Sequence, residues 1–349
     1  MLTNLDLLRS IAILVVLSAH WILTLSGNGP GERLVCGVDI HAFGRSGVLI
    51  FFVHTSLVLM KSLQRSGESG WRLFRAFYLR RIFRIYPLSI VLCVVMVVFA
   101  IPRNVMEPVY WWPGKIGLLG NLTLTLNILD VPSLSTPMWS LPYELQMYLL
   151  LPVIFLFLRV KRWALRFAVI FALGIAASRF WTLAVFVPDF LCGVLAFGLV
   201  RQVRPRWPAW IWPLLVLSSI AAFSTAARLH EDSFPVGLTL CLVLGTTMPL
   251  FRDATLRPLC LAASTLAKYS YGIYLCHFPL MWLFYRKLAA LPTAERHFGF
   301  VVSIVLLPVL CFHLVEHPLI KIGNWLATQR GALNSSGFVV SKVKADGAL

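Results

Sequence analysis

The class of fold is decided by the stretch from Leu5 to Leu25, which reads LDLLRSIAILVVLSAHWILTL. Most of its 21 residues are apolar, and Asp6, Arg9 and His20 are its only ionisable side chains. A helix gains about 1.5 Å per residue, so about 20 apolar residues cross the hydrocarbon core of a bilayer. This stretch therefore predicts a transmembrane helix.

The composition of the whole chain favours a membrane protein over a soluble one. Of 349 residues, 59% are hydrophobic and 13% are charged, and the mean hydropathy is +0.81. Soluble domains carry about 25% charged residues, so this chain lacks the polar side chains to cover a water-exposed surface. The net charge is +17, and the basic residues lie in short clusters between apolar runs. We interpret this charge as a marker of membrane topology, and no nucleic-acid partner is expected.

Apolar runs of similar length recur along the chain and predict an all-α, polytopic helical bundle of about ten transmembrane helices. The predicted spans are 5–25, 40–60, 84–101, 139–158, 164–178, 181–200, 208–226, 234–250, 268–287 and 297–317. The stretch 116–130 is apolar but short, and we treat it as external or re-entrant. The spans form one transmembrane domain over residues 1–325, followed by a polar tail at 326–349, which we expect to be flexible.

The distribution of Lys and Arg orients these spans. With the N-terminus in the cytoplasm, the cytoplasmic segments hold 21 Lys and Arg residues and the external segments hold eight. Cytoplasmic loops of membrane proteins carry such an excess, so the bias predicts that both termini are cytoplasmic.

The first span carries two ionisable residues in positions that suggest a site. Arg9 and His20 are eleven residues apart, close to three helical turns, which places them on one face about 16 Å apart. Ionisable side chains in the hydrocarbon are costly, so they mark functional sites by default. A cation and an imidazole on a shared face are suited to an anionic donor and to proton transfer. A packing histidine with a snorkelling arginine explains the same pattern equally well.

A second candidate segment runs from Thr136 to Pro152 and reads TPMWSLPYELQMYLLLP. It brings Trp139, Tyr143 and Glu144 to the outer start of the fourth span. A carboxylate can fix the tautomer of a histidine and raise its basicity, so Glu144 is a candidate partner for a general base. The alternative is an interfacial aromatic belt with a solvated carboxylate.

A basic cluster precedes the third span. Arg80, Arg81 and Arg84 lie there, and Arg81 and Arg84 share a helix face because they are three residues apart. Guanidinium groups pair well with phosphates, which would suit a phosphorylated cofactor arriving from the cytoplasm. Taken by themselves, these residues favour the alternative, attachment to anionic lipid headgroups.

Other polar residues lie within the spans. His41 and Arg45 are one turn apart on the second span and could face the same cavity as His20. His313 and His317 have a spacing that could hold a metal ion, with Glu316 between them. No third ligand is evident, and we expect no metal.

Several of these motifs, in a fixed order, resemble the acyltransferase-3 family of membrane O-acyltransferases. The first span matches its Arg-ten residues-His motif through Arg9 and His20. The other matching segments are RSGVLIFFVHTSLVL (45–59), FYLRRIFRIYP (77–87), MWSLPYELQMYLLLP (138–152), Phe190–Gly193, SYGIYLCHFPL (270–280) and Glu316–Pro318. The resemblance covers roughly residues 5–320. It departs from the family at span two, where Leu49 replaces a usual acidic residue and His54 is added.

The resemblance implies an enzyme of the bacterial cytoplasmic (inner) membrane. Such an enzyme moves an acyl group, usually acetyl, from acyl-coenzyme A to a hydroxyl of a carbohydrate, such as a cell-surface polysaccharide or a lipid-linked glycan. Residue by residue, it makes His20 the general base or acyl carrier, with Glu144 beside it in the catalytic group. It assigns Arg9, Arg80, Arg81 and Arg84 to the donor. The supporting residues are Trp139, Tyr143, His41, Arg45 and His277. The expected partners are acyl-coenzyme A, the carbohydrate and membrane lipids.

A rival function uses the same buried charges to line a transport path. A glycolipid or polysaccharide transporter or flippase would do so without acyl transfer. The sequence shows no inverted repeat and no paired broken helices, and dependence on coenzyme A separates the two functions. The residues leave open the acceptor, the acyl chain length, covalent or direct transfer, and the oligomeric state.

Overall fold

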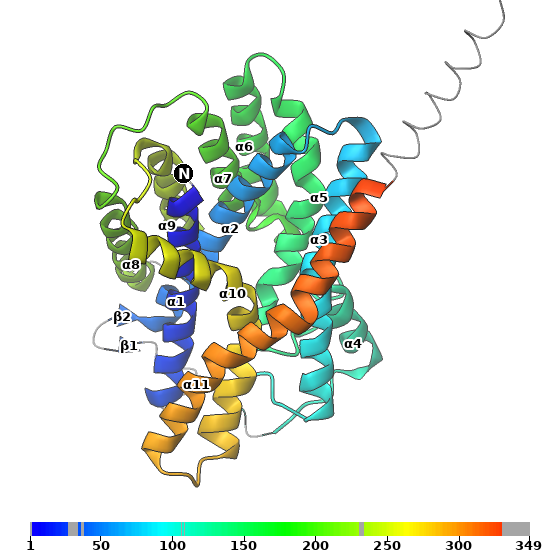
Figure 1. Cartoon of the computed structure of the whole chain (residues 1–349), viewed down its shortest axis with the longest axis vertical. Coiled ribbons are helices and arrows are strands. Elements are labelled where there is room, and N and C mark those ends of the chain that lie inside the picture. Colours follow the sequence, from blue (N-terminus) through cyan, green and yellow to red (C-terminus); the bar gives the residue numbers. More distant parts are fainter. Residues whose placement is uncertain are drawn as a thin grey trace, which may run out of the picture.

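The computed structural model describes residues 2–26, 34–35, 38–105, 107, 109–229 and 234–329. They form a helical bundle (Figure 1). The α-helices are α1 (Leu2–Ser26), α2 (Ile40–Arg65), α3 (Gly70–Val98), α4 (Gly114–Thr123), α5 (Leu141–Leu158), α6 (Trp163–Phe180), α7 (Val187–Val200), α8 (Ile211–Leu229), α9 (Phe234–Thr247), α10 (Arg257–Trp282) and α11 (Thr293–Cys311). Short 3₁₀ turns are η1 (Thr136–Ser140), η2 (Thr182–Ala184) and η3 (Met248–Leu250), and π-turns are η4 (Leu283–Lys287) and η5 (Phe312–Glu316).

The predicted spans fall on these helices, and the chain is a multi-pass helical membrane protein. Within the described residues, eight helical segments are long and apolar enough to cross a bilayer. The other two predicted spans fall on the shorter α9 and on α10, which is 26 residues long but is not one of those eight. Helix α4 has ten residues and reaches only about 15 Å, so the stretch 116–130 does not span the membrane as a helix.

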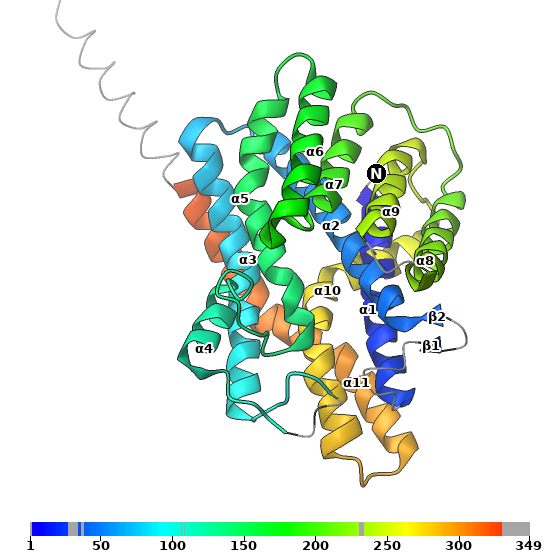
Figure 2. The same cartoon turned by 180° about the vertical axis from the view of Figure 1, so that it is seen from behind.

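Helix α2 lies at the centre of the bundle, where it packs against α1, α5, α7, α8 and α9 (Figure 2). In its apolar window 72% of the residues are buried, compared with 11% in the peripheral α6. Two glycines allow close approach of its neighbours. A Cβ on Gly47 would lie 2.7 Å from the Ala12 carbonyl oxygen, and one on Gly193 would lie 2.1 Å from that of Val53. Small residues at such contacts are typical of membrane helix packing.

Helices α10 and α11 form an antiparallel pair that packs on α1 and α3. Both contain an internal proline, Pro279 in α10 and Pro308 in α11, and a π-turn follows each helix. Proline removes a backbone donor, and π-turns often occur at functional sites. The second π-turn ends on Glu316, which is buried.

The C-terminal helix and a small hairpin complete the described chain. Strands β1 (Leu34–Val35) and β2 (Val38–Asp39) pair antiparallel, and the Asp39 side chain caps α2 by accepting from the Ala42 amide at 2.9 Å. After η5 the chain stays helical as far as Gln329. The predicted domain boundary at residue 325 therefore falls inside this helix, and the tail beyond 329 lies outside the described residues.

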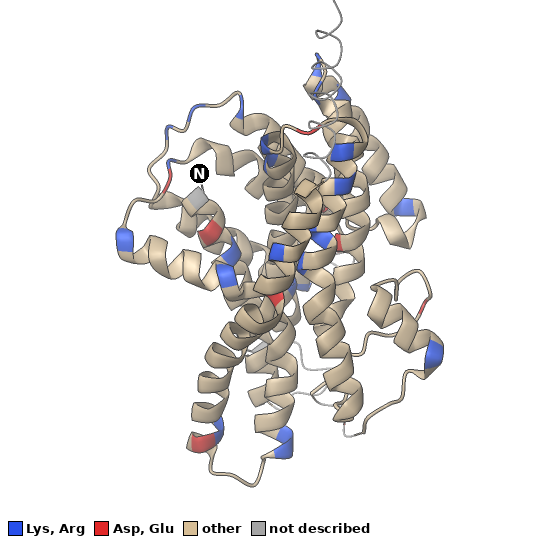
Figure 3. Ribbon diagram, turned by 45° about the vertical axis from the view of Figure 1, so that its right-hand side comes forward, with Lys and Arg blue, Asp and Glu red and all other residues tan. Residues whose placement is uncertain are grey.

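Basic residues gather towards one end of the bundle. Figure 3 shows most Lys and Arg over the half of the molecule that holds the start of α1, with few at the opposite end near the turn between α10 and α11. The basic end, where α1 starts, also carries the loop from α2 to α3 and the start of α6 (Figure 1). The asymmetry along the bundle matches the uneven Lys and Arg counts of the sequence.

Candidate active site

One cavity in the bundle is lined by side chains from α1, α2, α3, η1, α5 and α10, and we call it the arginine cavity. Its polar lining consists of Arg9, His54, Thr55, Arg81, Arg84, Ser140, Glu144, Tyr148, Ser270, Tyr271 and Tyr274. Three of the four arginines that the sequence assigned to donor binding therefore meet in one place, although they come from two helices far apart in the chain.

Each of the three arginines is held differently. Arg9 donates from Nε to the Ser270 hydroxyl at 2.6 Å, across the contact between α1 and α10. Arg84 forms an ion pair with Glu316, with 3.0 Å between Nη1 and Oε2. The Nε of Arg81 is buried and makes no hydrogen bond within the described part of the chain. A buried donor without a partner is costly, so Arg81 is suited to an anion that enters the cavity.

Arg80 does not line this cavity. It lines a separate crevice between α2 and α3, together with Ser62, Ser66 and Arg81. The reason is helical geometry: adjacent residues point about 100° apart, so only Arg81 and Arg84 face inward together.

Glu144 lines the arginine cavity, and its hydrogen-bond partners come from α2 and α5. It accepts hydrogen bonds from the Tyr148 hydroxyl, one turn away on α5, and from Thr55 at 3.4 Å. Within the described residues no hydrogen bond joins it to a histidine. A carboxylate beside three guanidinium groups balances part of their charge, so Glu144 belongs to the arginine cavity.

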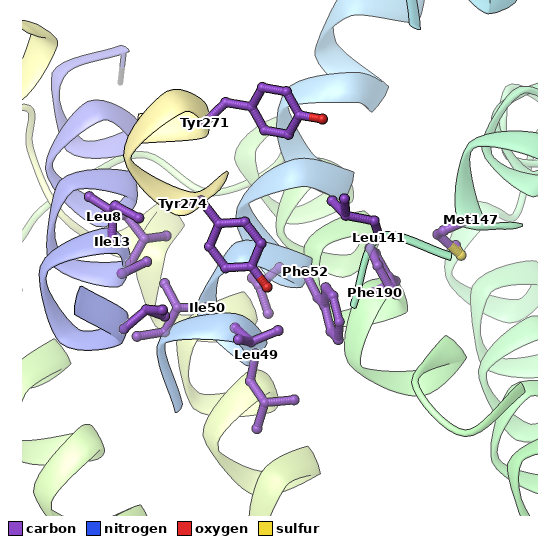
Figure 4. Close-up of a cluster of buried hydrophobic side chains, with 14 of the residues drawn as sticks. Leu8, Ile13, Leu49, Ile50, Phe52, Leu141, Met147, Phe190, Tyr271 and Tyr274 are labelled. Atoms are coloured by element: carbon purple, nitrogen blue, oxygen red, sulfur yellow. The ribbon is translucent and has the colours of Figure 1, made fainter. Parts of the chain in front are cut away.

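Tyrosines of α10 form the far wall of the arginine cavity. The Tyr271 hydroxyl donates to the Ile85 carbonyl at 2.8 Å, and the Tyr274 hydroxyl contacts Ser140 Oγ at 2.8 Å. Figure 4 shows both rings projecting from α10 towards the part of the core that holds Phe52 and Leu141. Both residues are buried.

Beyond Tyr274 lies a pair of stacked histidines, His20 of α1 and His277 of α10, which we call the histidine pair. Nε2 of His277 lies 3.1 Å from Nδ1 of His20, and the ring centroids are 5.1 Å apart. The Tyr274 ring centroid is 6.1 Å from that of His277, so one side chain separates the pair from the arginine cavity. His277 is fully buried, whereas His20 is partly exposed.

The two other predicted residues of span two diverge. His41 is exposed and is an electrostatic neighbour of His20. Arg45 is not directed at His20: its guanidinium lies over the Phe223 ring at 5.8 Å, and its electrostatic partners include Asp189 of α7. His41 and Arg45 are one turn of α2 apart. The neighbours of Arg45 are the Phe223 ring of α8 and the Asp189 carboxylate of α7.

Trp139 and Tyr143 do not line the arginine cavity. Both rings pack on Phe186, with centroid distances of 5.5 and 4.9 Å. Tyr143 lines an apolar groove between α5 and α7 on the opposite face of α5. Aromatic residues at this position support the packing of α7 on α5.

Sequence reasoning missed the cavity residues Tyr148, Ser270, Tyr271 and Tyr274. Tyr148 follows Glu144 by four residues, so helical periodicity could have found it. The others lie in SYGIY (270–274), a segment singled out without roles for these side chains. Among the described residues, no three potential metal ligands come together.

Comparison with known proteins gives one family and one curated relative. The profile of an acyltransferase domain, Acyl_transf_3, matches residues 2–314. The peptidoglycan O-acetyltransferase OatA of Listeria monocytogenes is 25% identical over 367 aligned positions, which cover 92% of this chain and 56% of that protein. The chain thus spans about half the length of this relative. No solved structure matches.

Proposed function

Because the chain belongs to the acyltransferase family whose profile matches residues 2–314, we propose that it transfers an acetyl group from acetyl-coenzyme A to a carbohydrate hydroxyl. Family membership makes it a multi-pass membrane acyltransferase. The donor, the acceptor and the residues that act on them are the content of the proposal.

The observation that carries the proposal is the arginine cavity. Coenzyme A bears several phosphate groups, and guanidinium groups bind phosphate through paired, charge-assisted hydrogen bonds. Arg9, Arg81 and Arg84 converge on one cavity, and Arg81 Nε is buried there without a partner. We assign these three residues to the donor phosphates and Glu144 to balancing their charge.

His20 is assigned to the chemical step. One ring nitrogen takes the proton of the acceptor hydroxyl as the hydroxyl oxygen attacks the thioester carbonyl carbon. The carbon–sulfur bond then breaks, and the proton passes from His20 to the leaving thiolate. The products are the acylated hydroxyl and coenzyme A with a free thiol, so charge and protons balance without a metal.

The separation of the two sites is consistent with a long donor. Arg9 and His20 are about 16 Å apart along α1. Coenzyme A has a long flexible arm between its phosphates and its thioester. The arginine cavity extends as far as Tyr274, whose ring neighbours His277. A donor with its phosphates at the arginines can therefore direct its acyl end towards His20.

The acceptor is assigned to the side of the bundle opposite the arginines. The Lys and Arg distribution favours cytoplasmic termini and a cytoplasmic arginine cavity, which would place His20 in the outer half of a bacterial inner membrane. His20 is partly exposed and His41 beside it is exposed, which gives a hydroxyl access. The Listeria relative is named for peptidoglycan, and we propose a cell-envelope glycan as the acceptor class.

The test is transfer of labelled acetyl from acetyl-coenzyme A in membranes that contain the full chain. Cell-wall glycan fragments and the host's own envelope glycans serve as acceptors. The proposal predicts labelled glycan with the wild-type protein and none with His20→Ala, while His313→Ala, on the outer surface of the bundle, retains transfer. Equal labelling by wild type and His20→Ala would overturn the assigned chemistry.

A further inference from the structure

His277 is the most deeply buried histidine that the structure describes, and both of its ring nitrogens have a defined neighbour. Its side chain is 0% exposed. Nδ1 lies 3.1 Å from the carbonyl oxygen of Ile273, one turn earlier on α10, and Nε2 lies 3.1 Å from Nδ1 of His20. The two histidines therefore extend a hydrogen-bonded chain that begins at a backbone carbonyl.

The direction of this chain follows from the chemistry of its first member. A carbonyl oxygen can only accept, so Nδ1 of His277 must carry the proton. In a neutral imidazole, Nε2 of His277 is then an acceptor, and Nδ1 of His20 must donate to it. This contact requires the tautomer of His20 that carries its proton on Nδ1 and its lone pair on Nε2.

We propose that His277 is a positioning residue that holds His20 in this tautomer and orientation, so that Nε2 of His20 is the nitrogen that accepts the hydroxyl proton. The inference deepens the proposed function and rests on it. The arrangement resembles the general pattern in which a third group orients a catalytic base. Here the orienting group is a neutral imidazole anchored to Ile273, where Glu144 had been expected.

A neutral orienting group suits the location. His20 lies on α1, which is long and apolar enough to span a membrane, and His277 is fully buried on α10, so an unpaired carboxylate would be costly in this place. Stacking at 5.1 Å, together with the Phe278 ring, whose centroid is 5.9 Å from that of His20, restricts rotation of the imidazole. A buried imidazole needs a hydrogen-bond partner whatever its role, so the specific feature of His277 is that its second nitrogen contacts His20.

The test compares two substitutions of His277 that differ in one property. His277→Gln keeps an acceptor near the position of Nε2, whereas His277→Phe keeps a ring of similar size without an acceptor. A general base contributes about 10²- to 10⁴-fold, and its misalignment loses part of this. We expect His277→Phe to lower kcat about 10- to 100-fold with the KM for acetyl-coenzyme A unchanged, and His277→Gln to restore at least half of the loss on a logarithmic scale. Wild-type kcat in His277→Phe, or equal losses in both variants, would overturn the proposal.

A second readout does not depend on activity. In protein labelled with ¹⁵N-histidine and reconstituted in lipid nanodiscs, the nitrogen chemical shifts report which ring nitrogen is protonated, and His20→Gln identifies the signals of His20. In the wild type we expect His20 to be protonated at Nδ1 and unprotonated at Nε2. In His277→Phe we expect His20 to be a mixture of both tautomers. Protonated Nε2 in the wild type would refute the inference. If the tautomer is as expected but His20→Ala still transfers acetyl, the proposed function fails, whereas the geometry of the pair stands.

Discussion

The arginine cavity and the histidine pair lie along the same contact between α1 and α10, yet they are built from opposite kinds of group. At one end Arg9 contacts Ser270, and charged side chains from several helices converge. At the other end His20 contacts His277, and the hydrogen-bonded chain contains two imidazoles and a backbone carbonyl. Charge in a membrane is costly unless it is paired or hydrated. The contrast supports the proposal that anionic groups of the donor bind at the charged end and that the chemical step occurs among neutral groups.

The largest effect is expected from His20→Ala, which removes the base and leaves the arginines in place. Turnover should fall by about 10²- to 10⁴-fold, the usual contribution of a general base. Initial rates of labelled acetyl transfer provide the measurement. A fall of less than about tenfold would mean that the histidine pair is not the chemical centre.

The next effect is on donor binding. Arg81→Ala should weaken binding of coenzyme A by about 10- to 100-fold, since a hydrogen bond to a charged group contributes about 1.5–3 kcal/mol. Arg80→Ala is the matched control, because Arg80 neighbours Arg81 in the chain but lies outside the arginine cavity. Equilibrium binding of labelled coenzyme A measures both. An equal loss of affinity for coenzyme A in Arg81→Ala and Arg80→Ala would contradict the assignment of Arg81, and not Arg80, to donor binding.

A third effect concerns the stability of the charged end. Glu316→Gln should destabilise the protein by about 1–3 kcal/mol, because it leaves Arg84 without the buried carboxylate that pairs with it. Glu107→Gln is the control. Its pair with Arg103 is 3.9 Å long and the two side chains are 40% and 45% exposed, so about 0–1 kcal/mol is expected. The stability of the two variants is compared by heating them in detergent and measuring the fraction of protein that remains folded.

The smallest effect on the transfer rate is expected for Tyr143 of α5. Tyr143→Phe keeps the ring that packs on Phe186 and removes only a hydroxyl outside the arginine cavity. Its transfer rate should stay within about twofold of the wild type. A large loss would show that this face of α5 takes part in the reaction.

The fold was largely predictable because apolar runs report transmembrane helices directly. The spans on α1, α2, α3, α5 and α11 follow from them, as does the break between α6 and α7. The end of the last helix was not predictable in the same way. Residues 326–329, which the prediction placed in the polar tail, are helical because they continue a helix that is already formed.

The sequence predicted many of the residues of the candidate site, but it did not predict which of them contact each other. Spacing along one helix placed Arg9 and His20 on a common face, and it placed Arg81 beside Arg84. It could not show that Glu144 faces the arginines or that His277 meets His20, because these contacts join distant segments. His20 and His277 are 257 residues apart in the chain, and only the packing of α10 on α1 brings them together.

The measurement that tests the central claim most directly determines binding and turnover on the same three proteins. Binding of labelled coenzyme A and rates of acetyl transfer are measured for the wild type, His20→Ala and Arg81→Ala in nanodiscs. The division into two sites predicts that His20→Ala binds coenzyme A as tightly as the wild type but transfers no acetyl, while Arg81→Ala binds it at least tenfold more weakly. Loss of coenzyme A binding in His20→Ala, or unchanged binding in Arg81→Ala, would contradict it.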